Sequence, residues 1–450
     1  MKLGGSYTAP ACFSVSRGGY RGKDPLLAVL SLVELCGPSR FSHWDDEGHP
    51  VGCPHPAAWV QVAAVSREQT KNTMTMFPVL MSEQFKTDFQ IEAGKELIYA
   101  NGGRCRLEAV TSSYRSLEGA RSTFILLNET QHWVSGNGGI KMYETIDGNA
   151  TKGGNRYLSI TNAYLPGEDS VAERMRMAYM DVLEGRAPDL GYLYDSIEAH
   201  PKTGLDPDSL MVAIPLIRGD AIWINPLDVI ASVMKSDIAP ARSRRMWLNQ
   251  IVADADALYE EHDWDKLRCI DRLASGDRVV LGFDGGKSDD ATALVAIRVS
   301  DGLVQCLLIE EKPSDSGARD KDAPRWEVNR ERVDAAIHAA FATYDVVGFY
   351  ADVAYWESYI SDWGATYGHK LQARSGGNIN PIWWDMRGSL RRTTAAHELL
   401  MQTILDGKLK HGGERATELN RTLRRHLLNA RRRQNDYGVS FGKESKDSPL

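Results

Sequence analysis

Short apolar runs with β-strand character alternate with segments of helical spacing, and this alternation constrains the fold more than any other feature. In the N-terminal part the runs occupy residues 12–16, 59–66, 104–112, 122–130 and 156–164. Helical patterns occupy residues 25–35, 68–85 and 168–185, the last with acidic residues near its start. Strands that alternate with helices form a mostly parallel sheet, so we expect an α/β domain here.

The alternation resumes in the C-terminal part of the chain. Apolar runs occupy residues 278–286, 291–300, 303–312 and 345–356, with helical patterns at 330–344 and 394–409. Residues 226–275 have the pattern of amphipathic connector helices, and 450 residues are enough for two or three domains. We therefore predict an α/β domain at 1–225, a helical connector at 226–275 and a second α/β domain at 276–450.

The composition excludes several classes of protein. No apolar run reaches 18 residues and the N-terminus lacks the apolar segment of a signal peptide, so we expect neither a membrane span nor secretion. The cysteines form no CxxC pair, which is typical of reduced thiols in a cytoplasmic protein; they are Cys12, Cys36, Cys53, Cys105, Cys269 and Cys306. A net charge of −7 argues against a generally basic surface.

A glycine-rich loop, SRGGYRGKDP, joins the first apolar run to the first helix. Backbone N–H groups at such a helix start point at an anion, and Lys23 adds a positive charge. The pattern G-x-x-x-x-G-K-[ST] is met at Gly22 and Lys23, whereas Arg17 replaces its first glycine and Asp24 its hydroxyl residue. From this stretch alone, a phosphate-binding loop and a polar turn without a ligand are both open.

Polar residues follow two later strands. The run STFILLNET ends in Asn128 and Glu129, and strand-end carboxylates in ATPases of this loop class hold magnesium and orient the attacking water. Glu129 is therefore a candidate base, with Asn128 in the place of the usual aspartate; an ordinary strand-end glutamate is the alternative. The run RYLSITNAY adds Ser159, Thr161 and Asn162 as groups that could sense the terminal phosphate.

The stretch VVLGFDGGKSDDATALVAI places Asp284 at the end of an apolar strand, with two glycines beside it. Two-metal phosphodiester chemistry needs several converging carboxylates, one of which bridges ions about 3.5–4 Å apart. Asp284 fits that bridging position, and Asp352 ends the later strand VVGFYAD. Asp289 and Asp290 are weaker candidates, because solvated loop charges explain them better. The order strand–acid, hairpin, helix, strand–acid is that of ribonuclease-H-like nucleases, although Asp284 could instead cap a turn.

Taken together, these stretches resemble the large terminase subunit of tailed bacteriophages, and most closely that of actinobacterial phages. The resemblance covers nearly the whole chain and rests on GKDPLLAVLSLVELCGPSRFSHWD, WVQVAAVSREQTKNTM, FILLNETQHW, LSITNAYLPGEDSVAERMR, GFDGGKSDDATALVAI, ADVAYWESYISDW and HLLNARRRQNDYGVSFGKESKDSPL. It implies a P-loop ATPase-like parallel-sheet domain followed by a ribonuclease-H-like nuclease domain. Such a protein drives genomic DNA into a procapsid with ATP and cuts the DNA concatemer.

The resemblance also assigns roles to residues. Lys23 would contact the β- and γ-phosphates of ATP, Glu129 would be the catalytic carboxylate, and Asn162 would lie in the motif that couples hydrolysis to movement. Arg17, Gly22 and Asp24 would complete the ATP site, with Arg17 or Arg21 as an arginine finger. In the nuclease, Asp284 and Asp352 would bind Mg²⁺, or Mn²⁺ in its place, with Asp290 and Asp447 as further candidates.

The same resemblance implies partners and a location. The partners are double-stranded DNA, the portal of the procapsid, the small terminase subunit and further copies of the chain in a ring, all in the host cytoplasm. Family members have a segment before the phosphate loop and a third nuclease acid after the equivalent of Leu450, so we expect this chain to be incomplete at both ends.

The function and three smaller features of the sequence each leave an alternative open. A ribonuclease-H-like recombinase or transposase would need a third acid, for which Glu398 is the helical candidate, and a catalytically impaired terminase remnant would fit Asp24 and Asn128. Zinc is a weak alternative to a polar loop at His43, His49, Cys53 and His55, because their spacing is not standard. The arginine-rich run 421–434 favours contact with DNA, and the alternative is a helix face exposed to solvent. The candidate DNA-binding residues are Arg424, Arg425, Arg431, Arg432 and Arg433. For Trp383 and Trp384 we expect packing in the core, and stacking on a DNA base is the alternative.

Overall fold

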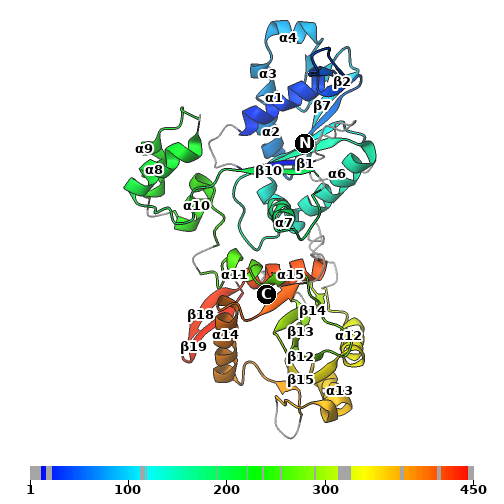
Figure 1. Cartoon of the computed structure of the whole chain (residues 1–450), viewed down its shortest axis with the longest axis vertical. Helices are drawn as coiled ribbons and strands as arrows, with labels where there is room; N and C mark the ends of the chain where they lie inside the picture. Colours follow the sequence, from blue (N-terminus) through cyan, green and yellow to red (C-terminus); the bar gives the residue numbers. More distant parts are fainter. Residues whose placement is uncertain are drawn as a thin grey trace. The chain divides into compact units, whose positions relative to one another are not determined.

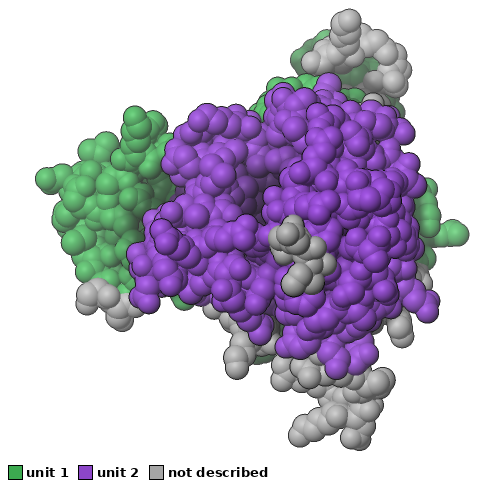
Figure 2. Space-filling view, turned by 90° about the horizontal axis from the view of Figure 1, so that it is seen from below, with its two compact units in different colours: residues 1–165, 169–252 green, residues 166–168, 253–450 purple. Residues whose placement is uncertain are grey.

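The chain forms two compact units in a computed structural model (Figures 1 and 2). Unit 1 comprises residues 1–165 and 169–252, and unit 2 comprises residues 166–168 and 253–450. The structure describes residues 12–16, 23–111, 117, 119–189, 191–219, 221–235, 238–253, 256–287, 290–312, 326–375, 380–412 and 417–443. The stretch 226–275, which we predicted to be a connector, is divided between the two units.

Unit 1 is built on an eight-stranded sheet in the order β10-β1-β9-β8-β4-β7-β6-β5. The first six strands of that order run parallel, and β6 and β5 add an antiparallel edge. The strands are β1 (Cys12–Ser16), β4 (Trp59–Ala64), β5 (Glu92–Ala93), β6 (Leu97–Ala100), β7 (Cys105–Thr111), β8 (Phe124–Leu127), β9 (Arg156–Thr161) and β10 (Tyr192–Ser196). The predicted parallel α/β sheet is therefore confirmed.

Helices cover both faces of this sheet, as alternating side chains of its strands require. Leu126 of β8 packs in the core with Leu27 and Leu35, whereas its neighbours Ile125 and Leu127 pack in the other core with Ile140. The helices on the first face are α1 (Lys23–Cys36), α2 (Arg67–Met74) and α3 (Phe77–Leu80), and those on the second are α6 (Gly139–Gly153) and α7 (Val171–Leu183).

Three further helices of unit 1 form a small core of their own. They are α8 (Pro207–Arg218), α9 (Pro226–Val233) and α10 (Pro240–Leu248), each with proline in its first turn. Proline fits that position because its missing N–H has no partner there. Leu210, Ile214, Val229 and Leu248 are buried together.

Residues 38–56 contain a largely exposed hairpin of β2 (Arg40–Trp44) and β3 (Pro50–Cys53). One local expectation for unit 1 was wrong. The helix expected at 68–85 is broken into α2, α3 and α4 (Glu83–Asp88), because Ser82 caps α4 and Pro78 opens α3. Our reading also missed α6 and β10.

Unit 2 contains a seven-stranded sheet in the order β11-β17-β14-β13-β12-β15-β16. Strands β12, β13 and β14 form an antiparallel meander, and β15 and β16 add to β12 in parallel. The strands are β11 (Arg268–Cys269), β12 (Arg278–Asp284), β13 (Thr292–Arg298), β14 (Leu303–Glu310), β15 (Asp345–Asp352), β16 (Trp383–Trp384) and β17 (Lys410–Gly412). This central meander followed by parallel strands is the ribonuclease-H-like arrangement that the sequence predicted.

One face of the unit 2 sheet is packed against α12 (Arg330–Thr343) and α13 (Glu357–Tyr367). Leu281 and Phe283 of β12 face this core, whereas Gly282 and Asp284 point to the exposed side. The remaining elements are α11 (Glu261–Asp265), α14 (Leu390–Leu405), α15 (Glu418–Leu428) and a hairpin of β18 (Arg431–Asn435) and β19 (Gly438–Gly442). Among the described helices of both units, none has the length and apolar character needed to cross a membrane.

Candidate active sites

The candidate ATP site in unit 1 begins at Lys23, the first residue of α1. Its side chain is almost fully buried, and its Nζ donates a 2.5 Å hydrogen bond to Oδ1 of Asn162. A lysine buried at a helix start needs an acceptor, and the Asn162 amide supplies one. The predicted ATP contacts Arg17, Arg21 and Gly22 lie outside the described residues.

Asn162 connects that lysine to the predicted catalytic carboxylate. Nδ2 of Asn162 donates to Oε2 of Glu129 over 3.3 Å. Glu129 comes soon after β8, and Asn162 directly follows β9. Because β8 and β9 are parallel neighbours, their carboxyl ends meet at one edge of the sheet, which is where open α/β sheets bind ligands.

The backbone of Glu129 is held in an uncommon conformation. Its φ of 57° and ψ of 51° are left-handed, which costs a non-glycine residue on the order of 1 kcal/mol. Gln131 holds this turn, since its amide nitrogen donates to Glu129 and its Oε1 accepts from Thr161 Oγ1 at 2.7 Å and from the Asn162 backbone at 3.2 Å. Our sequence reading missed Gln131, although a buried amide two residues after a strand-end acid could have indicated it.

Asp24 and Asn128 lie beside this chain of contacts. Burial raises the pKa of the Asp24 carboxyl, and nearby Glu129 raises it further, while Lys23 opposes both. Asn128 is buried and donates to Thr73 Oγ1 at 3.1 Å, and no donor among the described residues reaches its Oδ1. The carboxyls of Asp24 and Glu129, together with the Asn128 Oδ1, are oxygen ligands that suit a hard cation such as Mg²⁺.

Other strand-end groups of unit 1 are occupied within the fold. Ser159 Oγ lies 2.8 Å from Thr130 Oγ1, and both side chains are buried. Thr161 is bound to Gln131, so of the three predicted phosphate sensors Asn162 alone reaches Lys23 and Glu129.

The candidate nuclease site lies in unit 2, where Asp284 ends β12 and Asp352 ends β15. The parallel register pairs Gly282 with Tyr350 and Phe283 with Ala351, so the two aspartates occupy the next position on adjacent strands. The predicted meeting of the two acids is therefore present in the structure. Oδ1 of Asp352 also accepts a 3.2 Å hydrogen bond from the backbone of Met386.

The electrostatics of Asp284 favour a positive ligand. Desolvation raises the pKa of its carboxyl to about 6, and Asp352 and Asp290 contribute to that rise. The residue nevertheless keeps solvent-accessible area, because its side chain points to the uncovered face of the sheet.

Asp290 lies close enough to influence Asp284, and an ion pair with Lys443 holds it. Lys443 directly follows β19 and lowers the pKa of Asp284. The sequence reading did not identify this lysine, because the hairpin brings it from 153 residues away. Asp289 and Asp447 lie outside the described residues.

The edge also holds Asp385, which follows β16, the strand next to β15. Its carboxylate accepts from the backbones of Arg387 at 3.1 Å and Gly388 at 2.8 Å, so it shapes the turn beside Asp352. Within the described ranges, no three His, Cys, Asp or Glu side chains are grouped closely enough to hold a metal ion. Asp284 and Asp352 fit Mg²⁺ or Mn²⁺ by their donor chemistry, as a pair of carboxylates.

The predicted DNA-binding arginines fall into two groups. Arg424 is buried against Asp265, with bonds of 2.7 and 2.9 Å, and against Glu261, while Arg425 binds Glu311 at 2.5 and 2.6 Å. Arg431 is also buried and donates to the carbonyl of Leu428. Acids or backbone of the same unit hold the guanidinium groups of these three, and DNA contact by the five arginines stays a prediction. Arg432 and Arg433 are exposed on β18.

The histidines near residue 50, the tryptophan pair and Glu398 each have contacts within the described residues. His49 lies 3.6 Å from Asp45, and Nδ1 of His55 accepts a hydrogen bond from the backbone of Ala57. Trp384 is half-buried and packs edge-on against Tyr350, whereas Trp383 is exposed, so the expected core packing does not extend to Trp383. Glu398 accepts from the backbone of Val439 in the hairpin, which ties it to β19.

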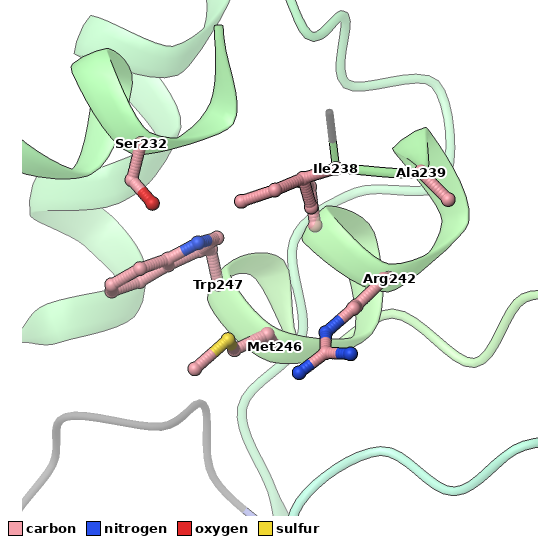
Figure 3. Close-up of a pocket in the computed structure, with 7 residues that line it drawn as sticks. Ser232, Ile238, Ala239, Arg242, Met246 and Trp247 are labelled. Atoms are coloured by element: carbon pink, nitrogen blue, oxygen red, sulfur yellow. The ribbon is translucent and has the colours of Figure 1, made fainter. Parts of the chain in front are cut away.

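A hollow of about 520 Å³ lies in the helical part of unit 1. Figure 3 shows Trp247, Met246 and Ile238 around it, with Arg242 at one side. Its lining carries no acid and neither Lys23 nor Glu129. We therefore place the chemistry at the strand ends rather than in this hollow.

Two curated relatives are similar to almost the whole chain. The Gene 13 protein of Mycobacterium phage D29 is 40% identical, and that of Mycobacterium phage L5 is 41% identical, each over 461 aligned residues. Both alignments cover 95% of this chain and 75% of the relative. No family model matches.

Solved structures were compared as well. The large terminase of bacteriophage HK97 has a TM-score of 0.45 at 15% identity, covering 98% of this chain and 89% of that one. The magnesium-bound large terminase nuclease of phage G20c has a TM-score of 0.26 at 16% identity, covering 43% of this chain and 92% of that one. On the identity and coverage of the two curated relatives, the chain belongs to the family of the Gene 13 proteins of mycobacteriophages D29 and L5.

Proposed function

We propose that this chain is the large subunit of a phage terminase, an ATP-driven DNA translocase with a metal-dependent endonuclease. The observation that carries the proposal is the presence of two strand-end sites in one chain. Unit 1 links Lys23, Asn162 and Glu129, and unit 2 aligns Asp284 with Asp352. A recombinase would need the second site only, so the first favours a motor.

In unit 1 we assign each side chain a role toward ATP. Lys23 Nζ binds terminal phosphate oxygens and exchanges its Asn162 acceptor for them. Glu129 accepts the proton of the attacking water as the general base. Asn162 then couples hydrolysis of the terminal phosphate to movement of the strand end, because its amide contacts both Lys23 and Glu129. A magnesium ion, when bound, would neutralise phosphate charge beside Asp24 and Asn128.

In unit 2 the two aspartates would hold the divalent ions that cut DNA. Such ions, when bound, stabilise the attacking and leaving oxygens of the phosphodiester. Asp284 lies on a rigid central strand and fits the shared ligand position, and Asp352 fits an outer one. The exposed Arg432 and Arg433 of β18 would contact DNA phosphates.

The partners in this proposal are double-stranded DNA, the portal of the procapsid, a small terminase subunit and further copies of the chain in a ring. The support for them is the resemblance of the sequence stretches together with the two sites. The chain would act in the cytoplasm of the bacterial host.

Plasmid cleavage in Mn²⁺ or Mg²⁺ tests the nuclease part directly. We expect cleavage by the wild type and none by Asp284→Asn. Asp362→Asn is the matched control, because Asp362 is an exposed aspartate of α13 in the same unit. Equal cleavage by Asp284→Asn and Asp362→Asn would contradict the proposed site.

A further inference from the structure

A tyrosine three residues beyond Asp352 has a strained backbone and an exposed side chain. Tyr355 has a φ of 70°, in a region that bulky residues rarely adopt, and is 53% exposed. It occupies the third position of a turn in which the backbone of Trp356 donates to the Val353 carbonyl at 3.1 Å. Glycine or asparagine is usual at such a position, so keeping tyrosine there has an energetic cost.

The surrounding residues hold this turn firmly. Nη2 of Arg330 donates to the Tyr355 carbonyl at 3.2 Å, and its guanidinium carbon lies 4.9 Å from the ring centroid of Trp356. Trp356 is fully buried, and its Nε1 donates to the Gly286 carbonyl at 3.0 Å. Gly286 belongs to the loop after Asp284, so the turn is anchored to the loops that follow both acids.

The side chain of Tyr355 has no structural task that would explain the strain. Within the described part of the chain, no hydrogen bond from its hydroxyl and no ring contact engages it, and Arg330 binds its carbonyl alone. Any residue at this position would present the same carbonyl to Arg330. The exposed ring is therefore available for a use outside the fold.

The distance from the acids limits what that use can be. Three residues of chain reach at most about 11 Å, so Tyr355 lies within that distance of Asp352 along the backbone. Consecutive phosphates of one DNA strand are about 3.4 Å apart in rise, so this distance corresponds to about three nucleotides. Aromatic rings bind nucleotides by stacking, with little dependence on base identity.

We propose that Tyr355 is a DNA-positioning residue whose ring packs against a nucleotide next to the phosphodiester held at Asp284 and Asp352. The inference rests on the proposed nuclease function and deepens it. The strained turn keeps the ring outside the protein core, and its held backbone fixes the point from which the ring projects. The ring would set where along the strand the backbone enters the site.

The test compares Tyr355→Phe, Tyr355→Ala and Tyr355→Gly with Tyr99→Ala, which removes an exposed tyrosine from unit 1. Short duplex DNA is titrated in Ca²⁺ to separate binding from cleavage, and thermal melting is measured on the same samples. We expect Phe to bind within about twofold of the wild type and both Ala and Gly to bind at least ~5-fold more weakly, the low end for loss of one stacked base. Tyr99→Ala should bind like the wild type.

Melting separates this role from a structural one. Gly relieves the left-handed strain and Ala does not, so we expect Tyr355→Gly to melt about 2 °C above Tyr355→Ala while both bind DNA weakly. A purely structural tyrosine would make DNA affinity follow stability. Wild-type affinity in Ala and Gly, with cleavage still abolished by Asp284→Asn, would overturn this inference alone. A wild type that neither binds nor cuts DNA would overturn the proposed function and this inference together.

Discussion

The side-chain amide of Asn162 joins Lys23 to Glu129, with its oxygen 2.5 Å from the lysine nitrogen and its nitrogen 3.3 Å from the glutamate. The two contacts use the two ends of one planar group. A movement of either partner therefore displaces the other end of the amide. This geometry supports the part we propose for Asn162 in the response of unit 1 to nucleotide.

Removing the amide should slow ATP hydrolysis more than it weakens ATP binding. We expect Asn162→Ala to lower kcat at least ~10-fold, because Glu129 loses a donor that orients it. Asn162→Asp should be worse, since a carboxylate would face Glu129. Steady-state ATPase assays measure kcat and KM. The control is Asn72→Ala, because Asn72 is an exposed asparagine of α2. A change in KM with kcat preserved would assign Asn162 to binding alone.

Asp284 should make stability depend on pH. Its folded pKa of about 6 lies above the ordinary value of 3.8, so the folded state binds more protons between these values and loses stability as pH rises through them. We expect Asp284→Asn to be more stable than the wild type at pH 8 by on the order of 1 kcal/mol, discounted for solvent screening. The difference should shrink towards pH 4. Urea unfolding at several pH values measures it, and a difference that does not vary with pH would be evidence against the raised pKa.

Lys443 should compete with divalent ions for Asp290. Its ammonium pairs with that carboxylate, and a cation cannot bind there fully until the lysine moves. Lys443→Met should therefore raise Mn²⁺ affinity by ~3- to 10-fold at low ionic strength. Calorimetric titration with Mn²⁺ tests this, and Lys408→Met, which breaks a 2.8 Å surface pair with Asp406, is the control. Unchanged or weaker Mn²⁺ binding in Lys443→Met would show that the lysine does not block the site.

The two groups of arginines should respond differently to mutation. Arg424→Met should destabilise the fold by about 2–3 kcal/mol, because Asp265 and Glu261 lose a buried partner. The double change Arg432→Ser with Arg433→Ser should leave stability nearly unchanged and reduce the salt slope of DNA binding by about 2. Chemical unfolding measures the stability of each variant, and DNA titrations at several salt concentrations measure the salt slope. A normal salt slope in the double variant would exclude this hairpin from the DNA path.

Sequence reasoning was strongest where the pattern was local. Runs such as 59–66 and 345–356 predicted β4 and β15, because their apolar residues continue through the whole strand. The strand-end positions of Glu129, Asp284 and Asp352 followed from the same runs. The breaks between α2, α3 and α4 were missed, since the capping of Ser82 competes with the helical spacing of residues 68–85.

Contacts between distant residues could not be predicted from the sequence. The pairing of Lys443 with Asp290 spans 153 residues, and the bonds of Arg424 to α11 span more. An arginine-rich helix looks alike in sequence whether its charges face DNA or acids of the same unit. The strain at Tyr355 is also invisible in the sequence, because tyrosine itself gives no sign of a positive φ.

The most direct test of the central claim, two separate active sites in one chain, measures ATP hydrolysis and DNA cleavage together in wild type, Lys23→Met and Asp284→Asn. We predict that Lys23→Met loses at least ~100-fold in ATP hydrolysis and still cuts DNA. Asp284→Asn should lose cleavage and retain ATP hydrolysis. If either folded variant lost both activities, the division of the chemistry between unit 1 and unit 2 would be contradicted.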